Sequence, residues 1–226
     1  MDSRSRSFLP AALSAAILAV STASIFIRFA QNGGASSLTI AALRLTFAAL
    51  LIAPLALTRH WIELKRLSRT EITLAVFSGA FLAVHFAAWI TSLEYTSVAS
   101  SVVFVSTGPL WVALLSPALL KERLSRGALA GLALALAGGI VIALFDARGS
   151  LGAGLSGRAL WGNFLALVGA WAVSGYLILG RKLRVSMSLI PYVFLAYGAA
   201  AVMLLLTMTA AGDSPFGLAP RTYLWI

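Results

Sequence analysis

The chain has 226 residues, of which 60% are hydrophobic and 11% are charged. A soluble protein of this composition would have too little polar surface to face water, so composition indicates an integral membrane protein. The formal net charge of +10 does not indicate nucleic-acid binding, because the basic residues lie in short links between apolar runs rather than in one stripe. The sequence has no cysteine, which excludes disulfides and thiolate metal sites.

Apolar runs of about 20 residues predict transmembrane helices, because about 20 helical residues cross the hydrocarbon core. The runs are continuous rather than alternating, and helices satisfy every backbone group in lipid. The predicted spans are Phe8–Ala30, Ser36–Leu57, Ile72–Leu93, Ser97–Leu120, Gly127–Phe145, Ala159–Leu179 and Leu189–Ala210. The first run is too long for a signal-peptide core, so we expect it to be retained. An eighth span is expected to open at Tyr223, where the sequence soon stops, so we expect a fragment or a truncated product.

The links between spans are strongly asymmetric in positive charge. The links on the N-terminal side contain Arg4, Arg6, Arg59, Lys65, Arg66, Arg69, Lys121, Arg123, Arg126, Arg181, Lys182 and Arg184. The opposite links contain only Arg148, Arg158 and Arg221. Because cytoplasmic loops carry the excess of Lys and Arg, the N-terminus is predicted to be cytoplasmic in a multi-pass protein of the inner or plasma membrane.

The longest outer link, Asp146–Arg158, is rich in Gly and Ser and is predicted to be a flexible connector. Five spans precede it. A duplicated five-helix unit would therefore enter the membrane from the opposite side, which is the inverted-repeat plan of many secondary transporters. A faint internal similarity places Ser21 of the first span on Ser174 of the sixth.

Arg44 is the most unusual residue, because it lies near the middle of the second span. A charge at that depth costs about 2.5–3.5 kcal/mol on insertion scales, so the side chain is expected to face the helix bundle or a watery cavity. Two interpretations stay open: a role in the solute pathway, and a structural role in binding carbonyl groups of a neighbouring helix.

His85 lies near the centre of the third span, and a polar stripe shares its helix face. The members of this stripe are Ser78, His85, Trp89 and Ser92. His85 could bind substrate or exchange a proton near neutral pH. Alternatively it makes an interhelical hydrogen bond, worth about 0.6 kcal/mol on average.

Two further groups of polar and aromatic residues point to the same kind of site. Ser14, Ser21, Ser24 and Arg28 follow one face of the first span, and Trp171 and Ser174 share a face of the sixth. Aromatic rings with a few hydroxyls are typical of a site for small amphipathic solutes, although serine also allows close helix packing. The predicted substrate-binding residues are Arg44, His85, Trp89, Ser21, Ser24, Trp171 and Ser174.

Pro109 and a run of small residues carry predictions about architecture. Pro109 lies in the middle of the fourth span and removes a backbone hydrogen bond there, so we predict a hinge. In the fifth span small residues recur at about four-residue steps, which predicts close helix contact: Gly127, Gly131, Ala135 and Gly138 or Gly139. Ser125 is expected to cap that helix.

Several short motifs occur in order between Ser92 and Leu144. They are Leu93 with Tyr95-Thr96-Ser97, the mid-span Pro109, Glu122-Arg123-Leu124, and Gly131 followed by Gly138-Gly139-Ile140. In this order the segment resembles the EamA-type transporters of the drug/metabolite transporter superfamily. The resemblance implies an all-α membrane protein of ten helices in two inverted halves. It also implies cytoplasmic termini and alternating-access transport of small metabolites.

The resemblance divides the chain into three parts. Residues 8–145 would be a complete five-helix repeat, 146–158 a connecting outer loop, and 159–226 a second repeat that is truncated near its third span. The implied partners are a small-molecule metabolite and the lipid bilayer. No cofactor, metal or nucleic acid is expected, and a homodimer stays open.

Three functions were compared on the sequence. A secondary transporter is favoured, because no phosphate-binding loop is present to use ATP. A nonfunctional or regulatory fragment of such a transporter is the alternative. A membrane-embedded enzyme is disfavoured, because Asp146 and Asp213 fall in separate outer loops and form no catalytic pair.

Overall fold

The computed structural model describes Ser14, Leu18 and residues 21–119, 125–149 and 157–226, with the backbone alone over 142–149. Over these ranges the secondary structure is helical. After an N-terminal helical segment, residues 21–32, the helices are α2 (Ser37–Arg59), α3 (Trp61–Arg66), α4 (Arg69–Tyr95), α5 (Val98–Val105), α6 (Gly108–Leu119), α7 (Arg126–Gly149), α8 (Gly157–Leu183), α9 (Leu189–Ala210) and α10 (Pro220–Tyr223). With α5 and α6 taken as one unit, five of the described helices are long and apolar enough to cross a membrane.

The helix bounds follow the predicted spans closely, with differences at α7, at Tyr223 and in the fourth span. The α7 helix continues to Gly149, so residues 146–149 of the predicted connecting loop are helical. Tyr223, where an eighth span was expected to open, ends the short α10 helix. The predicted span Phe8–Ala30 can be compared only from Ser21 onward, apart from Ser14 and Leu18, since its other residues lie outside the described part of the chain.

The predicted fourth span is two helices rather than one. The α5 helix ends at Val105, and α6 begins at Gly108 after a turn at Ser106 and Thr107. Pro109 is therefore the second residue of α6, a position where its fixed φ and missing N–H are tolerated. The fourth span is interrupted at the turn of Ser106 and Thr107, and Pro109 lies just after this turn, inside α6.

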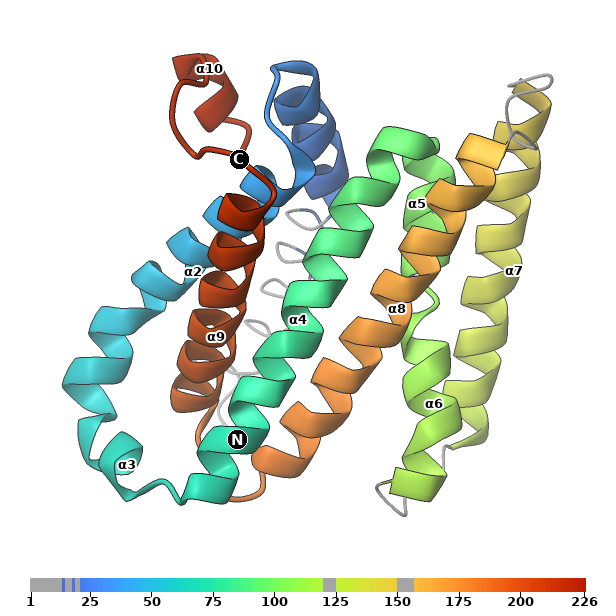
Figure 1. Cartoon of the computed structure of the whole chain (residues 1–226). Helices are drawn as coiled ribbons and strands as arrows, with labels where there is room; N and C mark the ends of the chain where they lie inside the picture. The colour runs from blue at the N-terminus through green and yellow to red at the C-terminus, as the bar shows by residue number, and fades with distance from the viewer. Residues whose placement is uncertain (1–13, 15–17, 19–20, 120–124, 150–156) are drawn as a thin grey trace.

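The helices form a bundle in which α4 has a central place (Figure 1). The α4 helix packs against α8 on one side and against α9 and α2 on the other. The α8 helix in turn contacts α5 and α6, and α7 packs against α5 at the far side of the bundle. The order across the bundle is therefore α2, α9, α4, α8, the α5–α6 pair and α7.

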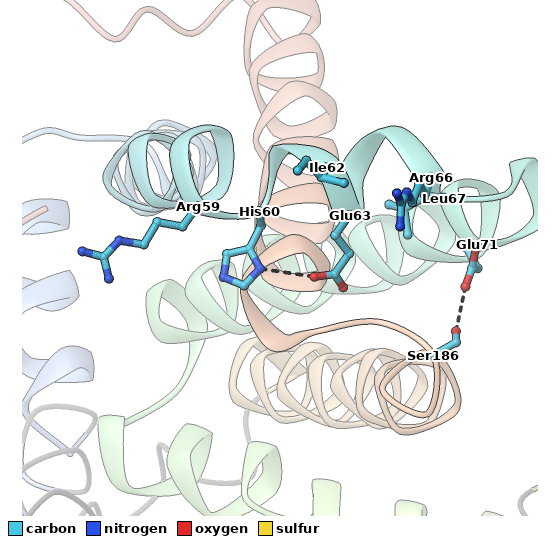
Figure 2. A pocket seen from close by; sticks show the side chains of 8 residues that line it. All are labelled: Arg59, His60, Ile62, Glu63, Arg66, Leu67, Glu71 and Ser186. Carbon is cyan, nitrogen blue, oxygen red and sulfur yellow. Dashed lines mark hydrogen bonds and ion pairs between the residues drawn. The ribbon is translucent and has the colours of Figure 1, made fainter.

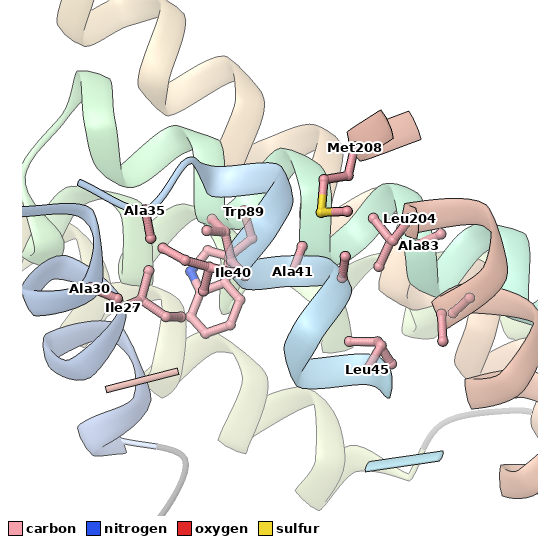
Figure 3. Close-up of a cluster of buried hydrophobic side chains, with 14 of the residues drawn as sticks. Ile27, Ala30, Ala35, Ile40, Ala41, Leu45, Ala83, Trp89, Leu204 and Met208 are labelled. Carbon is pink, nitrogen blue, oxygen red and sulfur yellow. The ribbon is translucent and has the colours of Figure 1, made fainter. Parts of the chain in front are cut away.

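The main apolar core lies where the N-terminal segment, α2, α4 and α9 meet (Figure 3). Ile27, Ile40, Leu45, Trp89 and Leu204 are its large buried members. Large apolar side chains also cover the outside of the bundle. Because lipid is as apolar as these side chains, the helices are held together by close packing and interhelical hydrogen bonds.

Glycines of α4 and α8 permit the closest helix contacts. A Cβ atom at Gly162 would lie 2.9 Å from the backbone nitrogen of Thr96, and one at Gly169 would lie 3.3 Å from Trp89 Cβ. At Gly79 of α4 a Cβ atom would lie 2.5 Å from the carbonyl oxygen of Ala196. These positions bring the backbones of α4, α8 and α9 together in the way that small residues do in membrane bundles.

The predicted small-residue contact along α7 is wrong for most of its length. No described atom lies within 4 Å of a Cβ atom built at Gly131 or Gly138, whereas one at Gly139 would meet Val103 at 3.2 Å. The spacing of small residues alone does not identify the helix that will be closely packed. Ser125 does cap α7 as expected, because its Oγ accepts a hydrogen bond from the Ala128 N–H at 3.1 Å.

Candidate functional site

Residues 169–174 of α8 lie between the part of α4 that holds His85 and Trp89 and the break in the fourth span. On one side they contact α4 at His85 and Trp89, and on the other they contact α6 at Gly108, next to the break in the fourth span. Both features lie away from the helix ends. We name this region the α8 centre, and five of the predicted site residues belong to it or adjoin it: His85, Trp89, Trp171, Ser174 and Pro109.

His85 makes the interhelical hydrogen bond that the sequence left as one of two interpretations. Its Nδ1 atom lies 2.8 Å from the carbonyl oxygen of Gly169. Because a carbonyl only accepts, Nδ1 carries the hydrogen, which makes Nε2 an acceptor in the neutral ring. The ring also stacks on Trp89, with centroids 5.8 Å apart. His85 thus joins α4 to α8 through Nδ1, and in this tautomer Nε2 can accept a hydrogen bond.

Trp89 is buried in the apolar core, with 9% of its surface exposed, yet its indole Nε1 has no hydrogen-bond partner among the described residues. Gln31 lies nearby, since its Nε2 donates to the carbonyl of Ile90 and to Ser37 Oγ, both at 2.9 Å. Its Oε1 is also buried without a partner in the described part of the chain. A buried donor and a buried acceptor without partners are costly, so each is expected to meet water or a ligand.

Ser174 connects α8 to the break between α5 and α6. Its Oγ lies 2.9 Å from the carbonyl oxygen of Gly108 and 2.7 Å from that of Ala170, and its side chain is fully buried. Gly108 is the first residue of α6, so this hydrogen bond ties α8 to the point where the interrupted helix resumes. Ser174 therefore stabilises the interrupted helix.

Trp171, about one turn before Ser174 on α8, also contacts α6. Its ring meets Trp111 of α6 edge to face at a centroid distance of 5.5 Å, and Trp111 Nε1 donates to Thr107 Oγ1 in the break at 3.2 Å. Trp171 keeps 42% of its surface exposed. The prediction that Trp171 and Ser174 share a helix face is confirmed, because both contact α6.

The serines predicted to share one face of the first span differ in their exposure in the structure. Ser24 is buried, whereas Ser21 is exposed and donates to the carbonyl of Leu18 in its own helix at 2.9 Å. Ser24 is therefore turned toward the bundle as expected, whereas Ser21 is not. A heptad spacing of small polar residues did not distinguish an inward serine from an outward one.

Arg44 lies away from the α8 centre, on α2. It is half-buried, and its Nη1 donates to the carbonyl oxygen of Ile226 at 3.1 Å. Ile226 lies outside the described helices, so this contact is not with a carbonyl group of a neighbouring helix, and both interpretations of Arg44 stay predictions. Among the predicted site residues, Arg44, Ser21 and Ser24 lie outside the α8 centre.

Sequence reasoning missed a hydroxyl cluster between α4, α8 and α9. Ser78 Oγ lies 2.7 Å from Tyr192 Oη, and that hydroxyl donates to the carbonyl of Tyr176 at 3.1 Å. The two tyrosine rings stack with centroids 5.7 Å apart. Tyrosines within apolar spans were the available signal, since a buried hydroxyl needs a partner.

An apolar cavity of about 490 Å³ lies between α5 and α7, beside the break. Its polar lining residues are Ser106 and Thr107, and Val103, Leu136 and Gly138 are among the apolar ones. A second, polar pocket of about 410 Å³ lies at one end of the bundle, where Arg59, His60 and Glu71 contribute to its lining. The described residues contain no group of three or more His, Cys, Asp or Glu that could hold a metal ion.

Comparison with known proteins agrees with this architecture. The model of the EamA-like transporter family matches residues 9–144, which is more than half of the chain. No curated relative and no solved structure matches the chain significantly. The apolar helices and the family match make this a multi-pass membrane protein. The chain belongs to the EamA-like transporter family, a membrane transporter family within the drug/metabolite transporter superfamily.

Proposed function

We propose that this protein is a secondary transporter that moves small metabolites across the inner or plasma membrane by alternating access. The observation that carries the proposal is the interrupted helix of α5 and α6 within a bundle of this family. Discontinuous helices expose backbone groups inside a bundle, and transporters commonly bind solutes at such positions. The solute would be small and amphipathic, since the α8 centre offers aromatic rings with few polar groups.

In this proposal the solute contacts the α8 centre from both sides. His85 Nε2 and Trp89 Nε1 supply an acceptor and a donor, and Trp171 supplies an exposed aromatic face. Pro109 and the adjacent turn act as the hinge about which α6 changes its angle to α5. Gln31, which bonds the carbonyl of Ile90, adds a second buried acceptor at its Oε1.

We further propose the inverted-repeat plan that the sequence suggested. Residues 8–145 would form the first five-helix repeat and 159–226 part of the second, with the N-terminus in the cytoplasm. Reporter fusions after Arg66 and after Lys182 test this topology. Both reporters should lie on the cytoplasmic side, and their appearance on opposite sides would overturn the arrangement.

The transport proposal is tested by comparing metabolite efflux and uptake between cells with and without the protein. At least one small solute should differ between the two. That solute is then followed in proteoliposomes with Trp89→Phe, which removes the unpartnered N–H and keeps an aromatic ring. The matched control is Trp161→Phe, because Trp161 is half-exposed on α8 and stacks on Phe164. Flux should fall in the first variant and stay unchanged in the control.

Two results would count against the proposal. If no solute differs between the two kinds of cell, the regulatory or nonfunctional alternative is favoured over transport. If Trp89→Phe and the control transport equally well, the site assignment is wrong even though transport stands.

A further inference from the structure

One end of the bundle carries most of the described basic residues. It contains the α2–α4 connection, the start of α7 and the α8–α9 connection, as seen at the lower side of Figure 1. The basic residues there are Arg59, Lys65, Arg66, Arg69, Arg126, Arg181, Lys182 and Arg184. Within the described ranges the acidic residues at this end are Glu63 and Glu71. The balance of charge at this end is strongly positive.

Both carboxylates are engaged in hydrogen bonds, at a pocket that Ile62 and Arg66 also line (Figure 2). Glu63 accepts from the Ser188 N–H at 2.6 Å and pairs with His60 Nδ1 at 3.2 Å. Glu71 accepts from Ser186 Oγ at 2.7 Å and from the Ser68 N–H at 2.8 Å. The acidic groups therefore connect α3 and α4 to the α8–α9 loop instead of neutralising the basic side chains outside.

The outer face of α3 combines apolar and basic side chains. Trp61 and Ile62 are 48% and 67% exposed, and Lys65 and Arg66 follow one helical turn later, both exposed. Residues four apart lie on the same side of a helix, so Trp61 adjoins Lys65 and Ile62 adjoins Arg66. Lys65 Nζ lies 4.8 Å from the centre of the Trp61 ring. Arg66 forms no ion pair with any carboxylate in the described part of the chain.

We propose that this outer face of α3 binds the headgroups of anionic phospholipids in the adjoining leaflet. Trp61 and Ile62 would lie at the boundary of headgroups and acyl chains, where tryptophan is favoured. Lys65 and Arg66 would contact the lipid phosphates, as basic residues flanking a transmembrane helix do. The occupant is identified by charge complementarity, because the face is cationic and the carboxylates of Glu63 and Glu71 beside it are engaged by hydrogen bonds from Ser188, Ser186 and Ser68. The proposal does not depend on transport activity.

The test is native mass spectrometry of the full chain in detergent, titrated with phosphatidylglycerol or with phosphatidylcholine. Each basic residue near an anionic surface changes the binding constant by roughly fivefold. Lys65→Gln combined with Arg66→Gln should therefore weaken binding of phosphatidylglycerol by roughly 25-fold and leave phosphatidylcholine binding unchanged. Both residues are exposed, so the variant is expected to fold, and its unfolding in detergent is measured alongside.

The matched control removes two positive charges from the opposite end, with Arg158→Gln and Arg221→Gln. Its affinity for phosphatidylglycerol should stay near that of the parent protein. An equal loss in the control would overturn the proposal, since net charge rather than the α3 face would then explain binding. Unchanged affinity in the Lys65 and Arg66 variant would overturn it as well. A second variant, Trp61→Ala, should weaken binding of both lipids.

Discussion

Gly79 is the position where the fold leaves least room for a side chain. A Cβ atom there would lie 2.5 Å from the carbonyl oxygen of Ala196 and 2.7 Å from Ala199 Cβ, both on α9. Carbon atoms pack at about 3.5–4.0 Å, so α9 would have to move away from α4 by about 1 Å. The obstructing atoms belong to the backbone and to a Cβ atom, which no rotamer change can remove.

We therefore predict that Gly79→Ala destabilises the protein by about 2 kcal/mol. Overpacking of this kind costs about 3 kcal/mol at the upper end of its usual range. Alanine recovers about 1 kcal/mol, because it is a better helix former than glycine. The difference between these two values is the expected loss.

Gly198→Ala on α9 is the matched control, because no described atom lies within 4 Å of its added Cβ. This variant should be as stable as the parent or more stable by up to about 1 kcal/mol. Both variants are unfolded in detergent micelles and followed by far-ultraviolet circular dichroism. Equal stability of the two variants would refute the inference that α4 and α9 are in backbone contact at Gly79.

Three further predictions concern single side chains. Ser174→Ala should cost about 0.6 kcal/mol in the same unfolding assay, since the Gly108 carbonyl loses a donor, and a cost of zero would contradict its role at the break. Arg44→Ala separates the two interpretations of that residue: a role in the solute pathway predicts loss of solute flux with membrane insertion intact, whereas unchanged flux would assign Arg44 to packing alone. For Glu63, partial burial raises the pKa, but hydrogen bonds from Ser188 and His60 outweigh it and leave the pKa below its usual value. The stabilisation by the Glu63 carboxylate is present above about pH 4.3, the usual pKa of glutamate, and is lost as the pH falls through the lower pKa of Glu63 in the folded protein. The loss of stability at acid pH should therefore be smaller in Glu63→Gln than in the parent protein.

The sequence was sufficient for the helices and for the class of protein, because continuous apolar runs have few alternatives in a membrane. Helix ends followed from polar links and caps, as at Ser125. The break at Ser106 and Thr107 was predicted only as a hinge at Pro109. A proline near a helix start and one that breaks a helix look alike until the hydrogen bonds around them are known.

The candidate site was harder to predict, because it depends on which face of each helix meets a neighbour. His85 and Trp89 were found from their spacing along one helix, and their stacking followed. Ser24 is buried as expected but Ser21 is exposed, since an apolar span has no polar side that marks its outside. The partner of His85 is a backbone carbonyl at Gly169, which no side-chain pattern could reveal.

The most extensive helix contact of the described structure joins α4 to α8, which belong to different proposed repeats. Glycines along α8 let its backbone interlock with α4, and interlocked helices resist sliding past one another. Any rearrangement that admits a solute would therefore carry α4 and α8 as one rigid piece. The boundary between moving parts would then run beside the α4–α8 pair. It would not coincide with the boundary between the two proposed repeats.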